Sequence, residues 1–121
     1  MTKEHPFFQK LNLVEFNSLS LESILQKEGL KILFLWGYEC PNCEIAKQSL
    51  SEEAEKVSKY PFQWYHCNVY EDFQVSTHFG LFGIPVFLFF KGSRALGRVT
   101  SYPGFEDFNS VLNKVWHEHR D

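Results

Sequence analysis

Two kinds of hydrophobic pattern alternate along this chain. Continuous apolar runs at 31–36 and 86–90 have the length of strands that are covered on both faces. Elsewhere, apolar residues recur every three or four positions, which is typical of amphipathic helices. One such helix follows Cys40 and ends near Lys59, and another has the stripe Phe105, Phe108, Val111, Leu112, Val115 and Trp116. Buried strands that alternate with helices predict parallel βαβ units.

Shorter patterns predict the other elements. The turn at 91–93 joins 86–90 to a further strand as an antiparallel hairpin. The order is β-α-β-α-β-α-β-β-α, an α/β fold with a mixed central sheet of about five strands flanked by four helices. No repeat or linker interrupts residues 1–121, so we expect a single domain. The remaining strands are expected over 12–16, 62–68 and 94–101, and the remaining helices over 18–27, with Ser18 as N-cap, and 73–79.

Composition and charge exclude several classes of protein. The 121 residues include 12 Lys and Arg against 15 Asp and Glu, a net charge of −3, whereas nucleic-acid-binding domains are usually basic. The aromatic fraction of 17% is too high for a disordered chain. Three cysteines, Cys40, Cys43 and Cys67, are too few and odd in number for a disulfide-stapled secreted module. A chain of this length can fold without staples, so the thiols are free for chemistry.

The sequence contains no visible targeting or membrane segment. Its longest apolar stretch, 84–90, contains Pro85 and is far shorter than the roughly 20 residues that span a bilayer. The start of the chain is polar, and no apolar run with a cleavage site follows it. We therefore expect a protein without membrane contact in the cytoplasm, or in the periplasm if a signal peptide has been removed.

The strongest chemical signal is Cys40-Pro41-Asn42-Cys43, which lies where a buried strand gives way to a helix. Two residues between the thiols allow a disulfide at the helix start, and Pro41 suits the first helical position. Cys40 would lie among free backbone N–H groups at the positive end of the helix dipole, which favours a thiolate. The pattern predicts that Cys40 attacks a substrate disulfide and that the more buried Cys43 resolves the mixed disulfide. Metal binding by these cysteines is the less favoured alternative.

Further segments extend this motif. Trp36 stands four residues before the first cysteine, the segment 79–85 ends in a proline, and Gly104 precedes the last helix. With these features at their spacing, the stretch 12–117 resembles the thioredoxin family. The resemblance implies a thioredoxin fold and a thiol–disulfide oxidoreductase whose redox group is the disulfide of the two motif cysteines, with no bound cofactor or metal.

The resemblance also implies a substrate-binding surface. Pro85 would follow a cis peptide bond and face the cysteines, and such a bond is tolerated essentially only before proline. Ile84 would offer its backbone to an extended substrate peptide. Trp36 and Gly104 would complete this surface beside the redox pair.

Phe34 marks the main departure from the family. Thioredoxins usually carry a buried aspartate six residues before the nucleophile, which helps to deprotonate the resolving cysteine, and this chain has Phe34 there. Glu44 and His66 are weak candidates for a replacement base, although a histidine on a strand is more often simply packed.

The residues around the first cysteine also differ from thioredoxin. Glu39 precedes Cys40 where thioredoxin has tryptophan, and its carboxylate would oppose a thiolate or select basic partner surfaces. Pro41-Asn42 replaces the usual Gly-Pro pair, which tunes the reduction potential. Proline after the first cysteine is seen in glutaredoxins and in periplasmic disulfide oxidases, which are less reducing. The two changes therefore pull in opposite directions.

Cys67, the third thiol, is expected to be a small buried hydrophobe in the strand 62–68. His66 and Cys67 are neighbours on that strand, so they point to opposite faces and cannot easily share a metal ion with the motif cysteines.

Two functions fit the sequence. The first is a monomeric oxidoreductase that reduces disulfide-containing proteins and is restored by an external reductase or thiol pool. The second is a non-enzymatic thioredoxin-like module that binds a dedicated protein partner. The aromatic excess motivates the second, with Tyr38, Phe82 and Tyr102 as loop residues near the motif.

Overall fold

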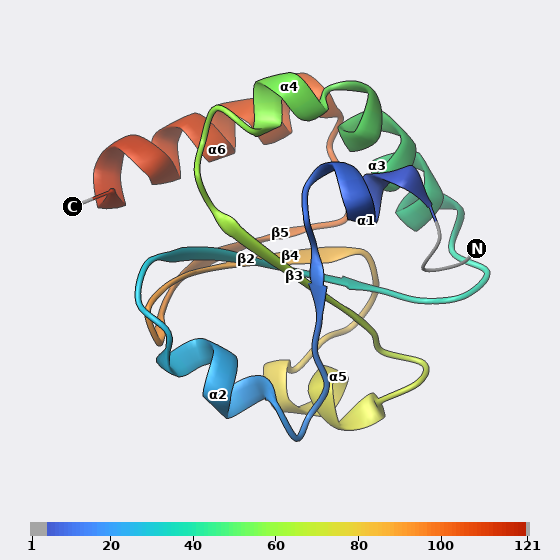
Figure 1. The fold of residues 1–121 in the computed structure, drawn as a ribbon. Helices are drawn as coiled ribbons and strands as arrows, with labels where there is room; N and C mark the ends of the chain where they lie inside the picture. The colour runs from blue at the N-terminus through green and yellow to red at the C-terminus, as the bar shows by residue number, and fades with distance from the viewer. Residues whose placement is uncertain (1–4, 121) are drawn as a thin grey trace.

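The computed structural model describes residues 5–120, which form a mixed five-stranded sheet in the order β1-β3-β2-β4-β5 (Figure 1). β1 and β2 are both parallel to β3, and β4 is antiparallel to both β2 and β5. The mixed sheet predicted from the sequence is thus confirmed. Its strands are β1 (Val14–Glu15), β2 (Leu30–Trp36), β3 (Gln63–Asn68), β4 (Val86–Lys91) and β5 (Arg94–Thr100).

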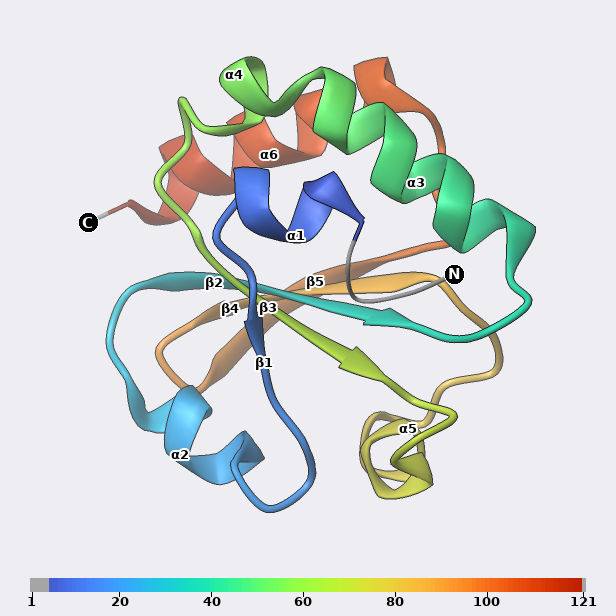
Figure 2. The same cartoon turned by 45° about the vertical axis from the view of Figure 1, so that its right-hand side comes forward.

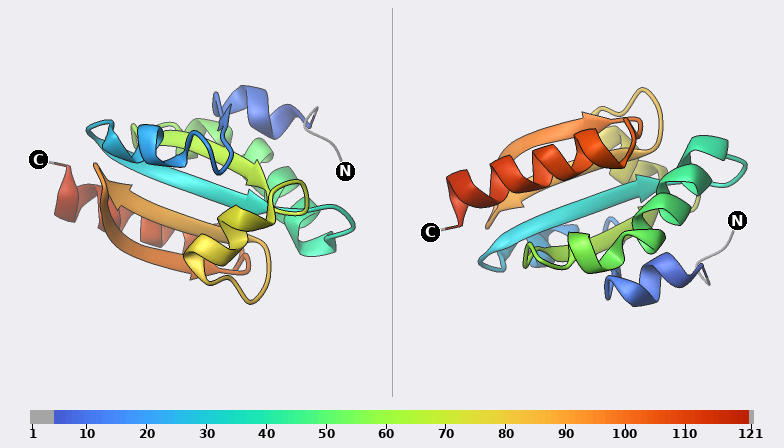
Figure 3. Two further views of the ribbon diagram at one scale, coloured as in Figure 1. Left: turned by 90° about the horizontal axis from the view of Figure 1, so that it is seen from below. Right: turned by 90° about the horizontal axis from the view of Figure 1, so that it is seen from above.

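Helices cover both faces of the sheet (Figures 2 and 3). β2 is buried along its whole length, because helices lie over both of its faces. One face carries α2 (Leu21–Gln26) and α5 (Phe73–Phe79), and the other carries α1 (Pro6–Lys10), α3 (Pro41–Glu52), α4 (Ala54–Val57) and α6 (Phe105–His119).

Two clusters of buried side chains fill the space between the sheet and its helices. Along β2, Ile32, Phe34 and Trp36 point into the cluster under α1, α3, α4 and α6. Leu33 and Leu35 alternate with them and point into the cluster under α2 and α5. The first cluster also contains both motif cysteines, so the candidate redox pair is anchored in the core.

Sequence patterns predict no helix before residue 12, yet α1 forms there. His5 caps it by accepting the N–H of Phe7 at 3.1 Å, and Pro6 takes a first-turn position. The helix is too short to carry a periodic pattern, and the burial of Phe7 and Phe8 in the core holds it in place.

The expected single helix from Cys40 to Lys59 is wrong, because it is divided at Glu53 into α3 and α4. The N–H of Glu53 donates to the carbonyl of Ser49 at 3.1 Å, and the ammonium of Lys10 donates to the carbonyl of Ser51 at 3.3 Å, next to the end of α3. With α1 and this division, the described residues contain six helices instead of four.

Two smaller expectations also change. The N-cap position of α2 belongs to Ser20 and not to Ser18, and the backbone N–H groups of Leu19 and Ser20 donate to the side-chain oxygen of Asn17 at 2.9 and 3.0 Å. β1 is limited to Val14–Glu15, where it pairs with β3 at the edge of the sheet. No helix in the described part of the chain is both long and apolar enough to cross a membrane.

Candidate functional site

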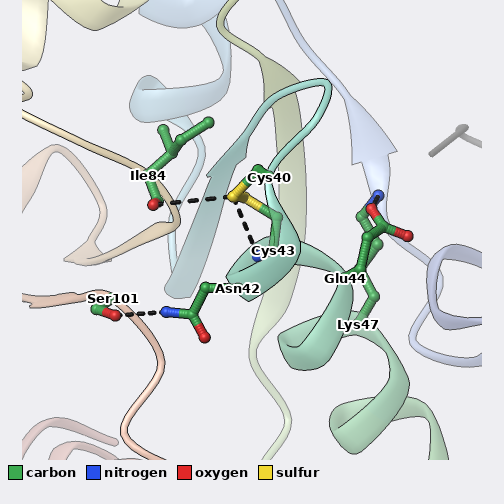
Figure 4. Close-up of a disulfide and its surroundings, with 7 residues drawn as sticks. All are labelled: Cys40, Asn42, Cys43, Glu44, Lys47, Ile84 and Ser101. Atoms are coloured by element: carbon green, nitrogen blue, oxygen red, sulfur yellow. Dashed lines mark hydrogen bonds and ion pairs between the residues drawn. A yellow bond between two sulfur atoms is a disulfide. The ribbon is translucent and has the colours of Figure 1, made fainter.

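The candidate site lies where β2 ends and α3 begins. Cys40 is the N-cap of α3 with an extended backbone, and Pro41 takes a first-turn position, where its missing N–H costs nothing. Cys40 and Cys43 form a disulfide, with their Cα atoms 5.2 Å apart (Figure 4). The pairing expected for the two motif cysteines is therefore present.

The two sulfurs have different surroundings. Cys40 keeps 8% of its surface exposed, whereas Cys43 is fully buried. Sγ of Cys40 accepts the backbone N–H of Cys43 at 3.1 Å. An N–H donor and the helix N-terminus both favour negative charge at this sulfur, so Cys40 is the accessible and electrostatically stabilised member of the pair.

The loop before β4 faces the disulfide. The peptide bond between Ile84 and Pro85 is cis, and the carbonyl oxygen of Ile84 lies 3.9 Å from Sγ of Cys40. Gly37 makes this approach possible, because a Cβ atom there would lie 2.7 Å from Cδ1 of Ile84 and 2.8 Å from the ring of Tyr70. The sequence places a glycine where the redox loop passes closest to its neighbours.

The loop after β5 meets the start of α3 from another side. The side-chain amide of Asn42 donates to Oγ of Ser101 at 2.5 Å (Figure 4). The N–H of Ser101 in turn donates to the carbonyl of Pro85 at 2.8 Å. Gly104 follows as the N-cap of α6 with φ of 98°, a left-handed backbone that suits glycine.

A cleft of about 390 Å³ lies beside this junction. It is bordered by Ile84 on one side and by Ser101 on another, and the fully exposed ring of Phe82 stands at its rim. The cleft therefore offers an apolar and partly polar surface beside Ile84, whose carbonyl lies 3.9 Å from Sγ of Cys40. Its other lining residues are Gly80, Leu81, Gly83, Val86, Arg98 and Thr100.

Glu39 and Tyr38 lie on the solvent side of the redox loop. Both are exposed, and Glu39 has a left-handed backbone with φ of 49°. The hydroxyl of Tyr38 donates to the carboxylate of Glu71. By contrast, Tyr102 is buried with its hydroxyl 2.7 Å from that of Ser49, so its expected role as an exposed loop residue is wrong.

Trp36 lies behind the disulfide and not at the surface. It has no exposed area, and its indole N–H donates to Nδ1 of His66 at 3.1 Å. A side chain without exposed area cannot touch a substrate in this conformation. Trp36 is therefore a supporting residue of the redox loop and not the substrate-binding residue that the sequence suggested.

Lys47 is the residue of this region that sequence reasoning missed. Its side chain is fully buried, its ammonium lies 3.8 Å from the centroid of the Trp36 ring, and it pairs with the carboxylate of Glu44 at 2.7 Å. Burial lowers the pKa of Lys47, and the carboxylate of Glu44 opposes that shift. The available signal was its place four residues after Cys43 on the apolar face of α3.

The two candidate replacement bases named above, Glu44 and His66, both contact other side chains in the structure. Figure 4 shows Ile84 on one side of the disulfide and the paired Glu44 and Lys47 on the other. His66 is buried against the ring of Phe8, with centroids 4.3 Å apart, and accepts from Trp36 through Nδ1. Glu44 is thus paired with Lys47, and His66 is held between Trp36 and Phe8.

Cys67 and His66 lie on opposite faces of β3, as expected. Cys67 is buried in the cluster under α2 and α5 and takes no part in the disulfide, whereas His66 packs under α1. Within residues 5–120, no group of three or more His, Cys, Asp or Glu side chains is arranged to hold a metal ion.

Comparisons with known proteins identify the fold. No family model matches the sequence, and no curated protein matches it significantly. Solved thioredoxins are nevertheless similar in shape. Mitochondrial thioredoxin 3 from Saccharomyces cerevisiae, in its oxidised form, has a TM-score of 0.71 at 14% identity over 90% of this chain and 97% of that chain.

Two further thioredoxins agree with this result. The protein from Malassezia sympodialis has a TM-score of 0.71 at 14% identity, covering 84% of this chain and 89% of that chain. A mutant thioredoxin from Halobacterium salinarum has a TM-score of 0.70 at 12% identity, covering 89% and 90%. The chain therefore has the thioredoxin fold, and its activity must be argued from the site.

Proposed function

We propose that this thioredoxin-fold protein is a thiol–disulfide oxidoreductase that reduces disulfides in other proteins. One observation carries the proposal. The Cys40–Cys43 disulfide lies at the N-terminus of α3, where Cys40 keeps 8% of its surface exposed and its Sγ lies beside the carbonyl of Ile84. A sulfur in that position can be reached by a substrate and is stabilised as a thiolate.

In the proposed reaction, Cys40 is the nucleophile. The Cys40 thiolate of the reduced protein attacks one sulfur of a substrate disulfide, and the other substrate sulfur leaves as a thiolate and takes up a proton. Cys43 then loses its proton and attacks Sγ of Cys40, which releases the second substrate thiolate. The motif disulfide forms, two electrons pass to the substrate, and an external reductase or thiol pool restores the dithiol.

The substrate peptide would lie in extended form along Ile84 and Pro85. Its side chains would enter the cleft bordered by Ser101. Gly104, three residues after Ser101, would extend this surface toward the start of α6. Pro41 and Asn42 would tune the thiolate, and Glu39 would stand at the edge that a partner approaches. We expect a monomer that works in a reducing compartment such as the cytoplasm, where the pair is kept as a dithiol.

The assay is reduction of insulin by dithiothreitol with catalytic amounts of the protein. Wild-type protein should accelerate insulin precipitation, and Cys40→Ser should lower the rate to that of dithiothreitol alone. Cys67→Ser is the matched control, because it removes the buried thiol outside the motif and should keep the activity. Equal rates for wild type and Cys40→Ser would sink the proposal.

The reduction potential of the pair tests the direction of the reaction. A value near about −270 mV would agree with a reductase, whereas a value near about −120 mV would make the protein an oxidant. Equilibration with glutathione buffers, followed by alkylation of the free thiols, measures it.

A non-enzymatic binding module is the second candidate. The exposed rings of Phe82 and Tyr38 beside the redox loop favour it, because such rings are enriched in interfaces. The two candidates differ in how a partner is held. A partner trapped by Cys43→Ser through a disulfide supports the oxidoreductase, whereas a partner held equally well by the double variant Cys40→Ser, Cys43→Ser supports the module.

A further inference from the structure

A cation is buried behind the redox pair. Lys47 has no exposed side-chain surface, although lysine is rarely buried completely. Burying an ammonium group is costly unless other groups compensate for its lost hydration. A residue of this kind within the core of the site therefore requires an explanation.

Two contacts compensate for that lost hydration. The ammonium of Lys47 lies 2.7 Å from the carboxylate of Glu44 and 3.8 Å from the centroid of the Trp36 ring. The ring of Phe8 is 5.3 Å away. The ammonium thus has an ion pair on one side and the faces of aromatic rings nearby, which attract cations.

Lys47 is also a neighbour of the resolving cysteine. Residues four apart on a helix lie one above the other, and both Cys43 and Lys47 are fully buried on the same face of α3. Trp36, which the ammonium contacts, belongs to the same core cluster as Cys43. The other buried lysine, Lys31, lies at the opposite end of β2, with its ammonium directed to backbone carbonyls that include that of Gly92.

Resting on the proposed oxidoreductase function, we propose that Lys47 is a positioning residue of the redox site. Its buried positive charge favours the thiolate of Cys43 over the thiol, and its contact with Trp36 holds the redox loop against α3. In thioredoxins, the buried aspartate at the position of Phe34 helps to deprotonate the resolving cysteine by accepting a proton. Here the positive charge of Lys47 would favour the same thiolate by attraction.

The charge matters at the second exchange step. Cys43 must lose its proton inside the core before its sulfur attacks Sγ of Cys40 in the mixed disulfide, and burial alone opposes a thiolate. The new S–S bond forms as the bond between Cys40 and the substrate breaks, and the released substrate thiolate takes up a proton. Lys47 keeps its own proton throughout. Its positive charge lowers the free energy of the Cys43 thiolate, and no atom passes to or from Lys47.

Three other groups with variable charge face this region. Glu44 bears the opposite charge, but its side chain is 31% exposed, so water screens it while Lys47 stays unscreened. Burial and then the charge of Lys47 lower the pKa of His5, which favours its neutral form. His66 accepts a hydrogen bond through Nδ1, so that nitrogen carries no proton. Of these groups, Lys47 is the fully buried cation on the helix face that also carries Cys43.

The test measures the pKa of Cys43 without any substrate. In a background of Cys40→Ser and Cys67→Ala, the ultraviolet absorbance of the remaining thiolate is followed against pH. Lys47→Met keeps the shape and removes the charge, and it should raise the pKa of Cys43 by about one pH unit, a tenfold smaller thiolate fraction. Lys56→Met is the matched control, because Lys56 pairs with Glu53 at the same helical spacing but is 60% exposed, and it should change nothing.

A second variant guards against a failure to fold. Glu44→Gln leaves the positive charge of Lys47 unopposed and should lower the pKa of Cys43. If Lys47→Met folds and the pKa of Cys43 is unchanged, the inference is overturned. If Lys47→Met does not fold, an unchanged or raised pKa of Cys43 in Glu44→Gln overturns it. Insulin reduction by the wild type is scored separately, so failure of the proposed function and failure of this inference are distinguishable.

Discussion

Phe34 explains why this site lacks the buried acid of thioredoxins. The residue has no exposed surface, and it is stacked on Phe87 at 5.0 Å and met edge-on by Phe7 at 5.3 Å. Its surroundings are therefore aromatic, and a carboxyl group there would lose its hydration among rings. The same α1 that supplies Phe7 and Phe8 thus makes the position unsuitable for an aspartate.

We therefore expect Phe34→Asp to destabilise the protein strongly. It should lower the free energy of unfolding by about 3–5 kcal/mol, because it removes ring contacts and buries a polar group. Urea denaturation measures the change. Phe34→Leu is the control for lost packing alone and should cost about 1–2 kcal/mol. An aspartate variant as stable as the leucine variant would contradict this account.

Among the elements, α5 is joined to the loop before α2 by one carboxylate. Asp72 is its N-cap and accepts the N–H of Gln74 at 3.2 Å. The same carboxylate accepts the N–H of Ser18 at 2.7 Å, across 54 positions of sequence. The backbone N–H of Ser18 is the largest cause that lowers the pKa of Asp72. This side chain therefore fixes both the start of α5 and the loop before α2.

Asp72→Ala should lower the free energy of unfolding by about 1 kcal/mol near neutral pH. The folded pKa of Asp72 lies below the unfolded value of about 3.9, so the stability contributed by its charge is complete above that value. It is lost as the pH falls through the folded pKa. Denaturant titrations at several pH values should show the gap between wild type and variant narrowing in acid.

Asp72→Asn separates charge from shape, because it keeps an acceptor of the same size. At neutral pH, its free energy of unfolding should differ from that of the wild type by less than that of Asp72→Ala does. In acid, it should equal that of the wild type. A gap that stayed constant over the whole range would mean that the carboxylate charge contributes nothing.

Considered as one molecule, the protein has two apolar clusters, one on each side of the sheet. The redox pair belongs to the cluster under α1, α3, α4 and α6, and the thiol of Cys67, which is outside the disulfide, belongs to the other. Cys67 is only 2% exposed. It therefore reports on opening of the core and not on the chemistry of the site.

In the oxidised native protein, we expect a thiol reagent to label Cys67 only as fast as the molecule unfolds. Adding urea to the transition region should accelerate labelling in parallel with the loss of fluorescence from the buried tryptophans. Cys67→Ala should give no labelling at all. Rapid labelling in the absence of denaturant would show that the sheet opens locally at β3.

Much of the fold and the chemistry could be predicted from local patterns. The continuous apolar run over β2 predicts a covered strand, and the positions of Cys40, Pro41 and Cys43 predict a disulfide at a helix start. These features depend on neighbours along the chain, through helical spacing, strand alternation and the needs of the first helical turn. For the same reason, Gly80 could be read as the end of α5, where it adopts the left-handed backbone.

Other features depend on partners that are distant in sequence, and they came only from the assembled fold. Lys47 reads as a charged residue on a helix, but the approach of Trp36 from β2 makes it a buried cation. The carbonyl of Ser51, beside the division at Glu53, accepts a hydrogen bond from the ammonium of Lys10, 41 positions earlier in the chain. The sequence alone thus determined the strands, the longer helices and the redox pair, because spacing encodes them. Which charges surround that pair was determined by the tertiary structure, because burial and pairing arise only when separate elements meet.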